Sequence, residues 1–432
     1  MMTNKENFQY DLVEKLSFRR YGGTEEELKA AEIILEEIEK AGGKGELMEF
    51  QIPAFDCSVC KVTFNGQEMD SVPYGFSGQT AAGGQDYKLV YIEDADEANF
   101  LGNKDLSGCC ALVNQLDLDM FKKLLEHKAS AFAAISGKYF ETDETTDLVP
   151  RTLRPQMLTF GKIPGVAIRG KDALTLLKAK EEAAGKGEDV YLHIDLQQTE
   201  TTHTSRDVLA VIEGTENKEE SIVITGHYDS VLVGTGSWDN ATGAAMLNML
   251  YNHFLENPPK RTLRFVWCGS EEQGLYGSIN YVKQHMDIME QIRFCFNFDM
   301  NGTLFGPNLG FITGGEDLEH WYMQAAMEYG YATKSRTLIH SSDSAPFALK
   351  DIPSIGLSRG GTGIMEIHTR NDLMPVLSAA EMYKNYEFAA YLIGRFVNAA
   401  MLPIERKLSD DMKKKAQEYF KLDKAPDYKV FD

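Results

Sequence analysis

The chain has 432 residues, 43% of them hydrophobic, which is enough to bury a large core and to form two domains. Its 65 acidic and 44 basic residues give a formal net charge of -21, which should repel nucleic-acid phosphates and anionic lipid surfaces. The composition therefore argues against disorder, against nucleic-acid partners and against binding to a membrane.

No apolar signal region begins the sequence, and no window has the roughly 18 uncharged apolar residues of a membrane span. We therefore expect a cytoplasmic protein. Six cysteines do not make a disulfide scaffold in so long a chain. Cys57 and Cys60 form a CxxC pair, but no second pair lies at zinc-finger spacing, so we interpret them as ordinary strand residues.

The first clear element is an amphipathic helix over residues 24–41. Thr24 and Glu27 have the spacing of a capping box, and Gly42 and Gly43 end the helix. The residues predicted to share its apolar face are Leu28, Ala31, Ile34, Leu35 and Ile38. We predict that this helix packs against the core.

Short strands and glycine-rich turns follow, from about Ala54 to Gly187. We interpret residues 54–187 as an inserted, β-rich domain. The segments 1–53 and 188–432 then form one discontinuous domain.

From Asp207 onward, predicted strands and helices alternate along the chain. The predicted strands are VLAVIEG, SIVITG, TLRFVWCG, IRFCFNFD, LGFIT and PSIGL. The predicted helices lie near residues 241–256, 274–285, 317–329 and 378–398. This alternation predicts an α/β fold, a mostly parallel twisted sheet with helices on both faces.

Imidazole and carboxylate side chains follow several of these strands. They are His227, Asp229, Asp239, Glu271, Glu272, Asp299 and His368. Because the carboxyl ends of parallel strands share one edge of a sheet, we expect these groups to converge there. Nitrogen and oxygen donors in this mixture suit zinc or a similar divalent ion.

A single His-x-Asp or Glu-Glu pair is most often part of a solvated loop. Asp299 differs, because the run with Phe294, Phe296 and Phe298 before it predicts burial. A buried carboxylate without a cation would cost several kcal/mol. The set as a whole therefore predicts a metal centre.

Six motifs in order resemble the M28 family of co-catalytic zinc peptidases, which have the zinc exopeptidase fold. These motifs are GHYDS, WDNATG, CGSEEQGLYGS, NFDMNG, SSDSAPF followed by DIPSIGL, and IHTRND. The similarity covers residues 207–398. The segments LSGCCALV, AFAAIS and IPGVAIRGKDA make the inserted domain resemble a protease-associated (PA) domain.

The resemblance implies a role for each donor. His227 and Asp299 would bind one Zn²⁺, Glu272 and His368 a second, and Asp239 would bridge the two ions, with Co²⁺ or Mn²⁺ as alternative metals.

The resemblance also implies that Glu271 is the general base and that Asp229 orients the imidazole of His227. Asp343 would lie near the metals, and the Asp239-Asn240 peptide bond is a candidate for the cis form. Trp238 and Ser344 depart from the family pattern and could reshape the substrate pocket.

We therefore predict an aminopeptidase that removes N-terminal residues from short peptides. A carboxypeptidase is the alternative, with Arg359 or Arg370 binding the terminal carboxylate of the substrate. A binding or scaffold protein that lost the reaction is an alternative of another class. The inserted domain could limit substrate length or mediate homo-oligomer formation.

Overall fold

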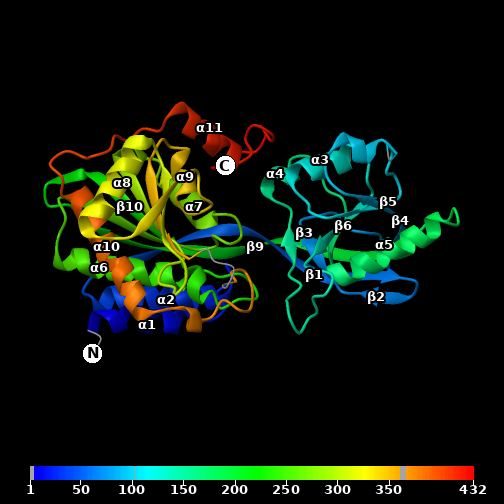
Figure 1. Ribbon diagram of the computed structural model, residues 1–432, viewed down its shortest axis with the longest axis horizontal. Helices are drawn as coiled ribbons and strands as arrows, with labels where there is room; N and C mark the ends of the chain where they lie inside the picture. Colours follow the sequence, from blue (N-terminus) through cyan, green and yellow to red (C-terminus); the bar gives the residue numbers. More distant parts are fainter. Residues whose placement is uncertain (1–3, 103, 361–365) are drawn as a thin grey trace. The chain divides into compact units, whose positions relative to one another are not determined.

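A computed structural model describes residues 4–102, 104–360 and 366–432. The chain divides into two compact units (Figure 1). The large unit comprises Met1–Ile52, His203–Lys424 and Lys429–Asp432, and the inserted unit comprises Pro53–Thr202 and Ala425–Tyr428.

The inserted unit begins one residue before the predicted boundary at Ala54 and continues past Gly187 to Thr202. Strand β9 (Tyr191–Ile212) explains the later boundary. Its first residues pair with β4 (Gln85–Ile92) of the inserted unit, and its last residues pair with β11 (Arg261–Cys268) of the large unit.

The large unit contains a mixed sheet with strand order β14-β13-β15-β12-β10-β11-β9. Its other strands are β10 (Asn217–His227), β11 (Arg261–Cys268), β12 (Ile292–Phe298), β13 (Asn308–Thr313), β14 (Thr333–Thr337) and β15 (Ser354–Arg359). The pairs β10–β11, β10–β12, β12–β15 and β13–β14 are parallel, whereas β13–β15 and β9–β11 are antiparallel. The prediction of a mostly parallel sheet is confirmed.

Helices cover both faces of this sheet. They are α1 (Asn4–Leu16), α2 (Glu25–Lys40), α6 (Thr242–Glu256), α7 (Tyr276–Gln284), α8 (Glu316–Tyr329), α9 (Ala345–Ala348), α10 (Ala379–Val397) and α11 (Asp410–Tyr419). Strand β14 and helices α1 and α9 were not predicted, because β14 is polar (TKSRT) and α9 has only four residues.

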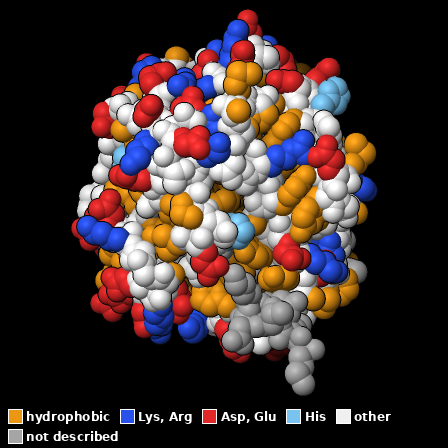
Figure 2. Space-filling model, turned by 90° about the vertical axis from the view of Figure 1, so that its left-hand side faces the viewer, with side chains coloured by type: hydrophobic (Ala, Val, Ile, Leu, Met, Phe, Trp, Pro, Cys, Tyr) orange, Lys and Arg blue, Asp and Glu red, His pale blue; other side chains and the backbone are white. Residues whose placement is uncertain are grey.

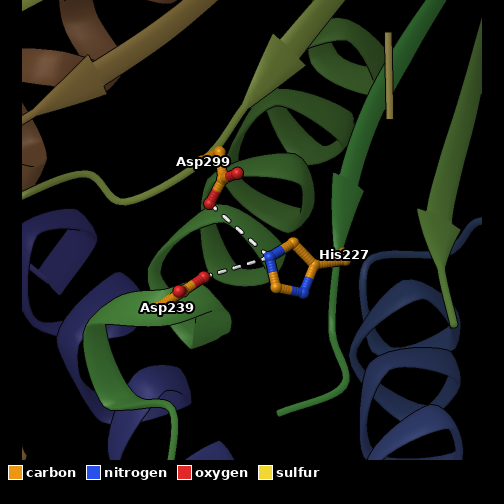
Figure 3. Close-up of side chains that lie close together, drawn as sticks. All are labelled: His227, Asp239 and Asp299. Atoms are coloured by element: carbon orange, nitrogen blue, oxygen red, sulfur yellow. Dashed lines mark ion pairs between the residues drawn. The ribbon is translucent and has the colours of Figure 1, made fainter. Parts of the chain in front are cut away.

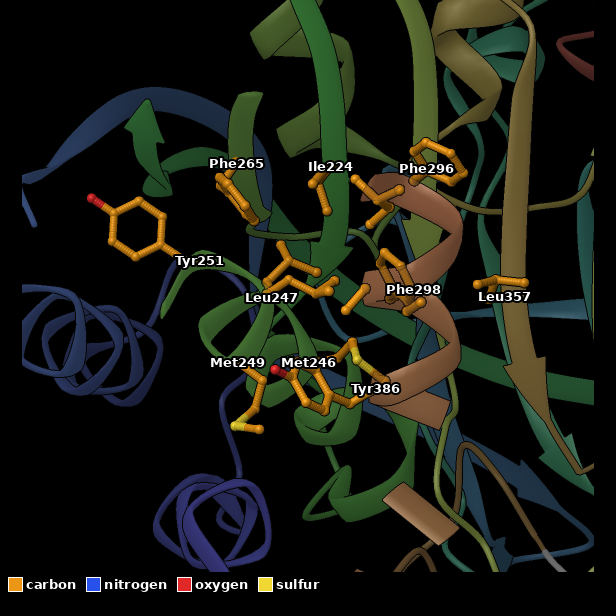
Figure 4. Close-up of a cluster of buried hydrophobic side chains, with 14 of the residues drawn as sticks. Ile224, Met246, Leu247, Met249, Tyr251, Phe265, Phe296, Phe298, Leu357 and Tyr386 are labelled. Atoms are coloured by element: carbon orange, nitrogen blue, oxygen red, sulfur yellow. The ribbon is translucent and has the colours of Figure 1, made fainter. Parts of the chain in front are cut away.

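The two faces follow from the alternation of side chains along each strand. In β10, Ile224 belongs to the hydrophobic cluster that includes residues of α1, α2, α6, α8 and α10, whereas its neighbour Val223 belongs to the cluster that includes residues of α7 and α9. Figure 4 shows Ile224, Phe296 and Phe298 of the strands facing Leu247 of α6. Both faces are therefore apolar, and polar groups are displaced to the ends of the strands.

Helix α2 confirms one half of the predicted capping box. The Glu27 N–H donates to the Thr24 hydroxyl at 3.3 Å. The Glu27 carboxylate, however, accepts the N–H of Gly23 at 2.8 Å rather than that of Thr24. Glu27 is fully buried, with Ser205 and Arg206 beside it.

The inserted unit has its own sheet, in which β4, β5, β6 and β8 are parallel neighbours. Its strands are β1 (Gly45–Phe64, shared with the large unit), β2 (Gln67–Met69), β3 (Ser71–Gly75), β4 (Gln85–Ile92), β5 (Cys109–Val113), β6 (Ala131–Ser136), β7 (Arg151–Thr152) and β8 (Gly165–Arg169). Helices α3 (Leu118–Glu126) and α4 (Pro155–Leu158) pack on one core and α5 (Gly170–Ala184) on another.

Cys57 and Cys60 lie in β1, and all six cysteines are free thiols. No helix in the described ranges has the length and hydrophobicity needed to span a bilayer. On the face shown in Figure 2, acidic and basic side chains are interspersed, with hydrophobic side chains between them.

Candidate metal centre

Three of the predicted donors form a first triad. His227 is the last residue of β10, Asp239 lies in the segment Ser237–Ala241, and Asp299 directly follows β12. The Nε2 atom of His227 is 3.2 Å from Asp239 Oδ1 and 3.5 Å from Asp299 Oδ1. Figure 3 shows both carboxylates pointing toward the same nitrogen. All three residues are buried.

Asp239, Glu272 and His368 form a second triad. His368 Nε2 is 3.2 Å from Asp239 Oδ2 and 3.1 Å from Glu272 Oε2. The side chain of His368 is 55% exposed, whereas that of Glu272 is 6% exposed. Asp239 therefore presents one carboxylate oxygen to each triad.

The sheet topology explains why these residues meet. Strands β10, β11 and β12 are parallel neighbours with β10 in the middle, and their carboxyl ends deliver His227, the Glu271–Glu272 pair and Asp299 to one edge. The structure thus brings together all five predicted metal ligands. Their roles as ligands remain predictions.

Asp229 is fully buried beside His227, with 3.4 Å between Asp229 Oδ1 and His227 Nδ1. The same carboxylate accepts the N–H of Glu271 at 3.0 Å and the N–H of Glu272 at 3.3 Å. Asp229 therefore lies where it can orient the imidazole, and it also fixes the backbone of the glutamate pair.

Charge dominates the first triad. Burial lowers the pKa of His227, but the charge of Glu271 and the contacts with Asp229, Asp239 and Asp299 outweigh it and leave that pKa well above its usual value. Burial likewise raises the pKa of Asp239, but the two imidazoles outweigh it and hold that pKa low. The triad thus favours a positive charge next to the bridging carboxylate.

The pKa values of the second triad and of the predicted base, Glu271, are also shifted by burial and by neighbouring charges. Contacts with Asp239 and Glu272 raise the pKa of His368 to about 11. Burial raises the pKa of Glu272 to about 7 and that of Glu271 well above its usual value. So many buried carboxylates need cations as partners.

The donor geometry fits metal ions. A zinc ion that binds nitrogen and oxygen at about 2.0–2.2 Å in tetrahedral geometry separates its donors by about 3.3–3.6 Å. The four separations between an imidazole nitrogen and a carboxylate oxygen in the two triads are 3.1–3.5 Å, at or slightly below this range. In addition, Glu272 Oε1 and Asp299 Oδ1 are buried and have no hydrogen-bond partner. The residues present therefore fit a pair of divalent ions.

Sequence reasoning missed Arg20, which is fully buried behind the loop that joins His227 to Asp239. Its guanidinium donates to the backbone carbonyls of Tyr228 at 2.6 Å and Gly236 at 3.0 Å, and also to that of Thr235. Burial lowers the pKa of Arg20 to about 10, although nearby carboxylates oppose that shift. Nothing in the local pattern SFRRYGG distinguishes this arginine from a solvated one.

Asp372 was also missed as a site residue, although it ends the IHTRND motif. It is 3% exposed and accepts the N–H of Trp238 at 2.7 Å and the N–H of Asp239 at 2.9 Å. Burial raises its pKa to about 6, against the effect of these two hydrogen bonds. Its position four residues after His368 was the available signal.

Other predicted positions have mixed outcomes. The Asp239-Asn240 peptide bond is cis, as predicted. Asp343 is buried, and burial raises its pKa to about 7, with His227 and Asp299 among the charges that act on it. Trp238 is 5% exposed, and its ring packs against the backbone of Gly360.

One of the two arginines predicted to serve a carboxypeptidase, Arg359, has other partners. Arg359 donates to Thr303 O at 2.7 Å and to Asn308 Oδ1 at 3.0 Å, and its Nη2 lies 3.2 Å from Glu381 Oε2. Its donors are thus used within the fold. The Ser344 hydroxyl lies 3.0 Å from that of Ser342.

Comparison with known proteins identifies the domain that carries these donors. The sequence profile of peptidase family M28 matches residues 207–393, which include both triads. Residues 207–393 therefore form a peptidase family M28 domain. The chain is thus a metallopeptidase, and its M28 domain lies within the large unit.

Two curated relatives differ in how much of the chain they match. Aminopeptidase YwaD of Bacillus subtilis is 26% identical over 413 residues, which are 93% of this chain and 86% of the relative. Carboxypeptidase Q of Rattus norvegicus is 31% identical over 160 residues, 36% of this chain and 32% of the relative. The second similarity thus covers about a third of either protein.

Two solved structures share the fold over nearly the whole chain. An aminopeptidase from Aneurinibacillus sp. strain AM-1 has a TM-score of 0.75 at 22% identity, covering 92% of this chain and 95% of its own. A zinc aminopeptidase from Bacillus subtilis, BSAP, has a TM-score of 0.75 at 21% identity, covering 95% and 100%. At these identities the likeness concerns the fold alone, and the resemblance of the inserted unit to a PA domain remains a prediction.

Proposed function

We propose that this M28 peptidase is a co-catalytic di-zinc aminopeptidase that hydrolyses the first peptide bond of short peptides. One observation carries the proposal: Asp239 Oδ1 lies 3.2 Å from His227 and Asp239 Oδ2 lies 3.2 Å from His368. A carboxylate placed between two donor sets in this way suits a pair of ions that share one ligand.

Each side chain then has a distinct task. His227 and Asp299 would hold one ion, Glu272 and His368 would hold the other, and Asp239 would bind both. When bound, two such ions lower the pKa of a water and polarise the scissile carbonyl. Asp229 fixes the ring of His227 and, through two backbone N–H groups, the positions of Glu271 and Glu272.

Glu271 moves the proton. As the water oxygen forms a bond to the carbonyl carbon, an O–H bond of that water breaks and its proton passes to the Glu271 carboxylate. The same proton then passes to the amide nitrogen as the C–N bond breaks, which releases the amine. Burial raises the pKa of Glu271, which makes the carboxylate a stronger base for this task.

The aminopeptidase direction is supported by two observations. The relative named an aminopeptidase matches 93% of the chain, whereas the relative named a carboxypeptidase matches 36%. In addition, Arg359 is held by Thr303, Asn308 and Glu381. A cytoplasmic location and self-association remain predictions.

A pair of assays tests the function. Zinc-loaded protein should release the N-terminal residue from free tripeptides and leave N-acetylated tripeptides intact. Cleavage of the acetylated peptides from the C-terminal end alone would contradict the aminopeptidase proposal. Fewer than one bound ion per chain after zinc-replete purification would instead favour a scaffold that has lost the reaction.

A further inference from the structure

We infer that Asp372 is a positioning residue that clamps the loop bearing His368 against the loop bearing Asp239, and thereby sets the affinity of the second triad for its ion. This inference rests on the proposed function, because it assumes that both triads bind metal. Asp372 is not itself a predicted metal ligand. Its carboxylate contacts the ligand Asp239 only through the backbone N–H of that residue.

The clamp consists of three hydrogen bonds between two loops. The two carboxylate oxygens of Asp372 accept the backbone N–H groups of Trp238 and Asp239 at 2.7 and 2.9 Å. In the reverse direction, the Thr235 hydroxyl donates to the backbone carbonyl of Asp372 at 2.7 Å. A single buried residue therefore joins the two segments that carry His368 and the bridging carboxylate.

Close packing supports the same junction. A Cβ atom at Gly234 would lie 2.7 Å from the carbonyl oxygen of Thr369, the residue after His368. The loops are thus in backbone contact on one side of Asp372. Side chains larger than hydrogen do not fit at Gly234, so the two loops pack directly against each other there.

The two triads depend on the clamp to different degrees. His227 ends β10 and Asp299 follows β12, and these strands are paired inside the sheet. Asp239 has further support, because the Thr242 hydroxyl donates to Trp238 O at 2.8 Å. His368, by contrast, lies in a loop, is 55% exposed, and has a positive φ of 58°.

A non-glycine residue in the left-handed region is stable only where its surroundings hold it. Among the described residues that follow His368, the first buried one is Asp372. Loss of the clamp should therefore release the His368 loop and weaken the second triad, while the strand-borne donors of the first triad stay in place.

Zinc titration of the metal-free full chain, in competition with a chromophoric chelator, tests this inference. Wild-type protein should bind two ions. Asp372→Asn retains the size of the side chain but has one acceptor oxygen for two N–H groups. Its affinity for the first ion should stay near the wild-type value, and its affinity for the second should fall by about 10–100-fold, the usual effect of losing a residue that supports a ligand.

Two further variants make the result specific. Asn371→Ala is the matched control, because Asn371 is exposed in the same loop and its side chain donates to Glu366; it should titrate like wild type. Thr235→Val removes the third hydrogen bond of the clamp and leaves the Asp372 carboxylate intact. It should lower the affinity for the second ion by less than Asp372→Asn does. If circular dichroism shows that Asp372→Asn does not fold, the zinc affinities of Thr235→Val test the clamp.

The outcomes separate the two proposals. Fewer than two ions in the wild type would contradict the proposed function. Two ions in the wild type, with unchanged affinities in both Asp372→Asn and Thr235→Val, would overturn the clamp alone. Equal weakening of both ions would also overturn it, because Asp372 would then act on the shared Asp239 rather than on the His368 loop.

Discussion

Each of the two units contains a run of parallel strands, but the residues at the ends of these strands differ. In the large unit the strand ends deliver buried His227, Glu272 and Asp299. In the inserted unit, β4 and β5 end before Glu93 and Asn114, which are exposed. Among the described residues, the donor clusters that could hold a metal lie in the large unit.

The difference shows that a parallel sheet edge is only a place where a site can form. What makes the site is the burial of acids next to imidazoles, because buried carboxylates require a cation and solvated ones do not. Each unit also has a fully buried arginine, Arg20 in the large unit and Arg169 in the inserted unit. Substitutions at matched positions in the two units test this difference.

Glu271→Gln should have the largest effect on activity. It removes the proton acceptor and leaves the donors in place, so kcat should fall by about 10²–10⁴-fold while zinc content is unchanged. The matched control is Glu93→Gln, at a strand end of the inserted unit, which should leave kcat at the wild-type value. Near-normal turnover in Glu271→Gln would show that another group moves the proton.

Arg20→Met should lower both stability and metal affinity. The substitution leaves the carbonyls of Tyr228, Thr235 and Gly236 without their buried donor, which should cost at least about 3 kcal/mol of unfolding free energy. Because this loop joins His227 to Asp239, zinc should also bind more weakly. Thermal melting and zinc titration check both effects, and wild-type values in both would contradict the role given to Arg20.

Arg169→Met should have a smaller effect, confined to stability. Arg169 contacts Asp70 and Asp143, and the Asp143 side chain is 77% exposed, so that water can replace its lost partner. We expect a loss of about 1–3 kcal/mol in unfolding free energy. Zinc affinity should not change. A loss of zinc comparable to that of Arg20→Met would mean that the site is not confined to the large unit.

Glu27→Gln should leave activity unchanged and alter only the pH dependence of stability. Burial raises the pKa of Glu27 from 4.5 to about 7, although Ser205, Gly23 and Arg206 oppose the shift. Between these two pH values the folded chain keeps a proton that the unfolded chain has lost. Glu27 therefore makes the protein less stable as the pH rises through this window, by about 3 kcal/mol in all.

Glutamine does not titrate, so the melting temperature of Glu27→Gln should vary less than that of the wild type between pH 4.5 and 7. Glu26→Gln is the control, because Glu26 is exposed on the same helix turn and should follow the wild-type curve. Parallel curves for wild type and Glu27→Gln would show that this carboxylate does not titrate in the window.

The convergence of the donors could be predicted because each follows an apolar strand or lies in the loop after one. The resemblance to the M28 family, and not this pattern, distinguished the five predicted ligands from Asp229 and Glu271. The second unit boundary could not be placed, because the middle of β9 (QQTETTHT) is polar and shows no alternation that marks a strand. Arg20 and Asp372 act on backbone groups of residues distant in sequence. Such contacts leave no pattern in the neighbouring sequence, so they can be identified only in the folded structure.

Anomalous diffraction at the zinc edge, from crystals of the zinc-loaded protein, tests the dinuclear centre most directly. We predict two peaks, each within about 2.0–2.2 Å of its donors: one at His227 and Asp299, the other at Glu272 and His368, with Asp239 bound to both. A single peak that does not contact Asp239, or no peak at this edge of the sheet, would contradict the assignment.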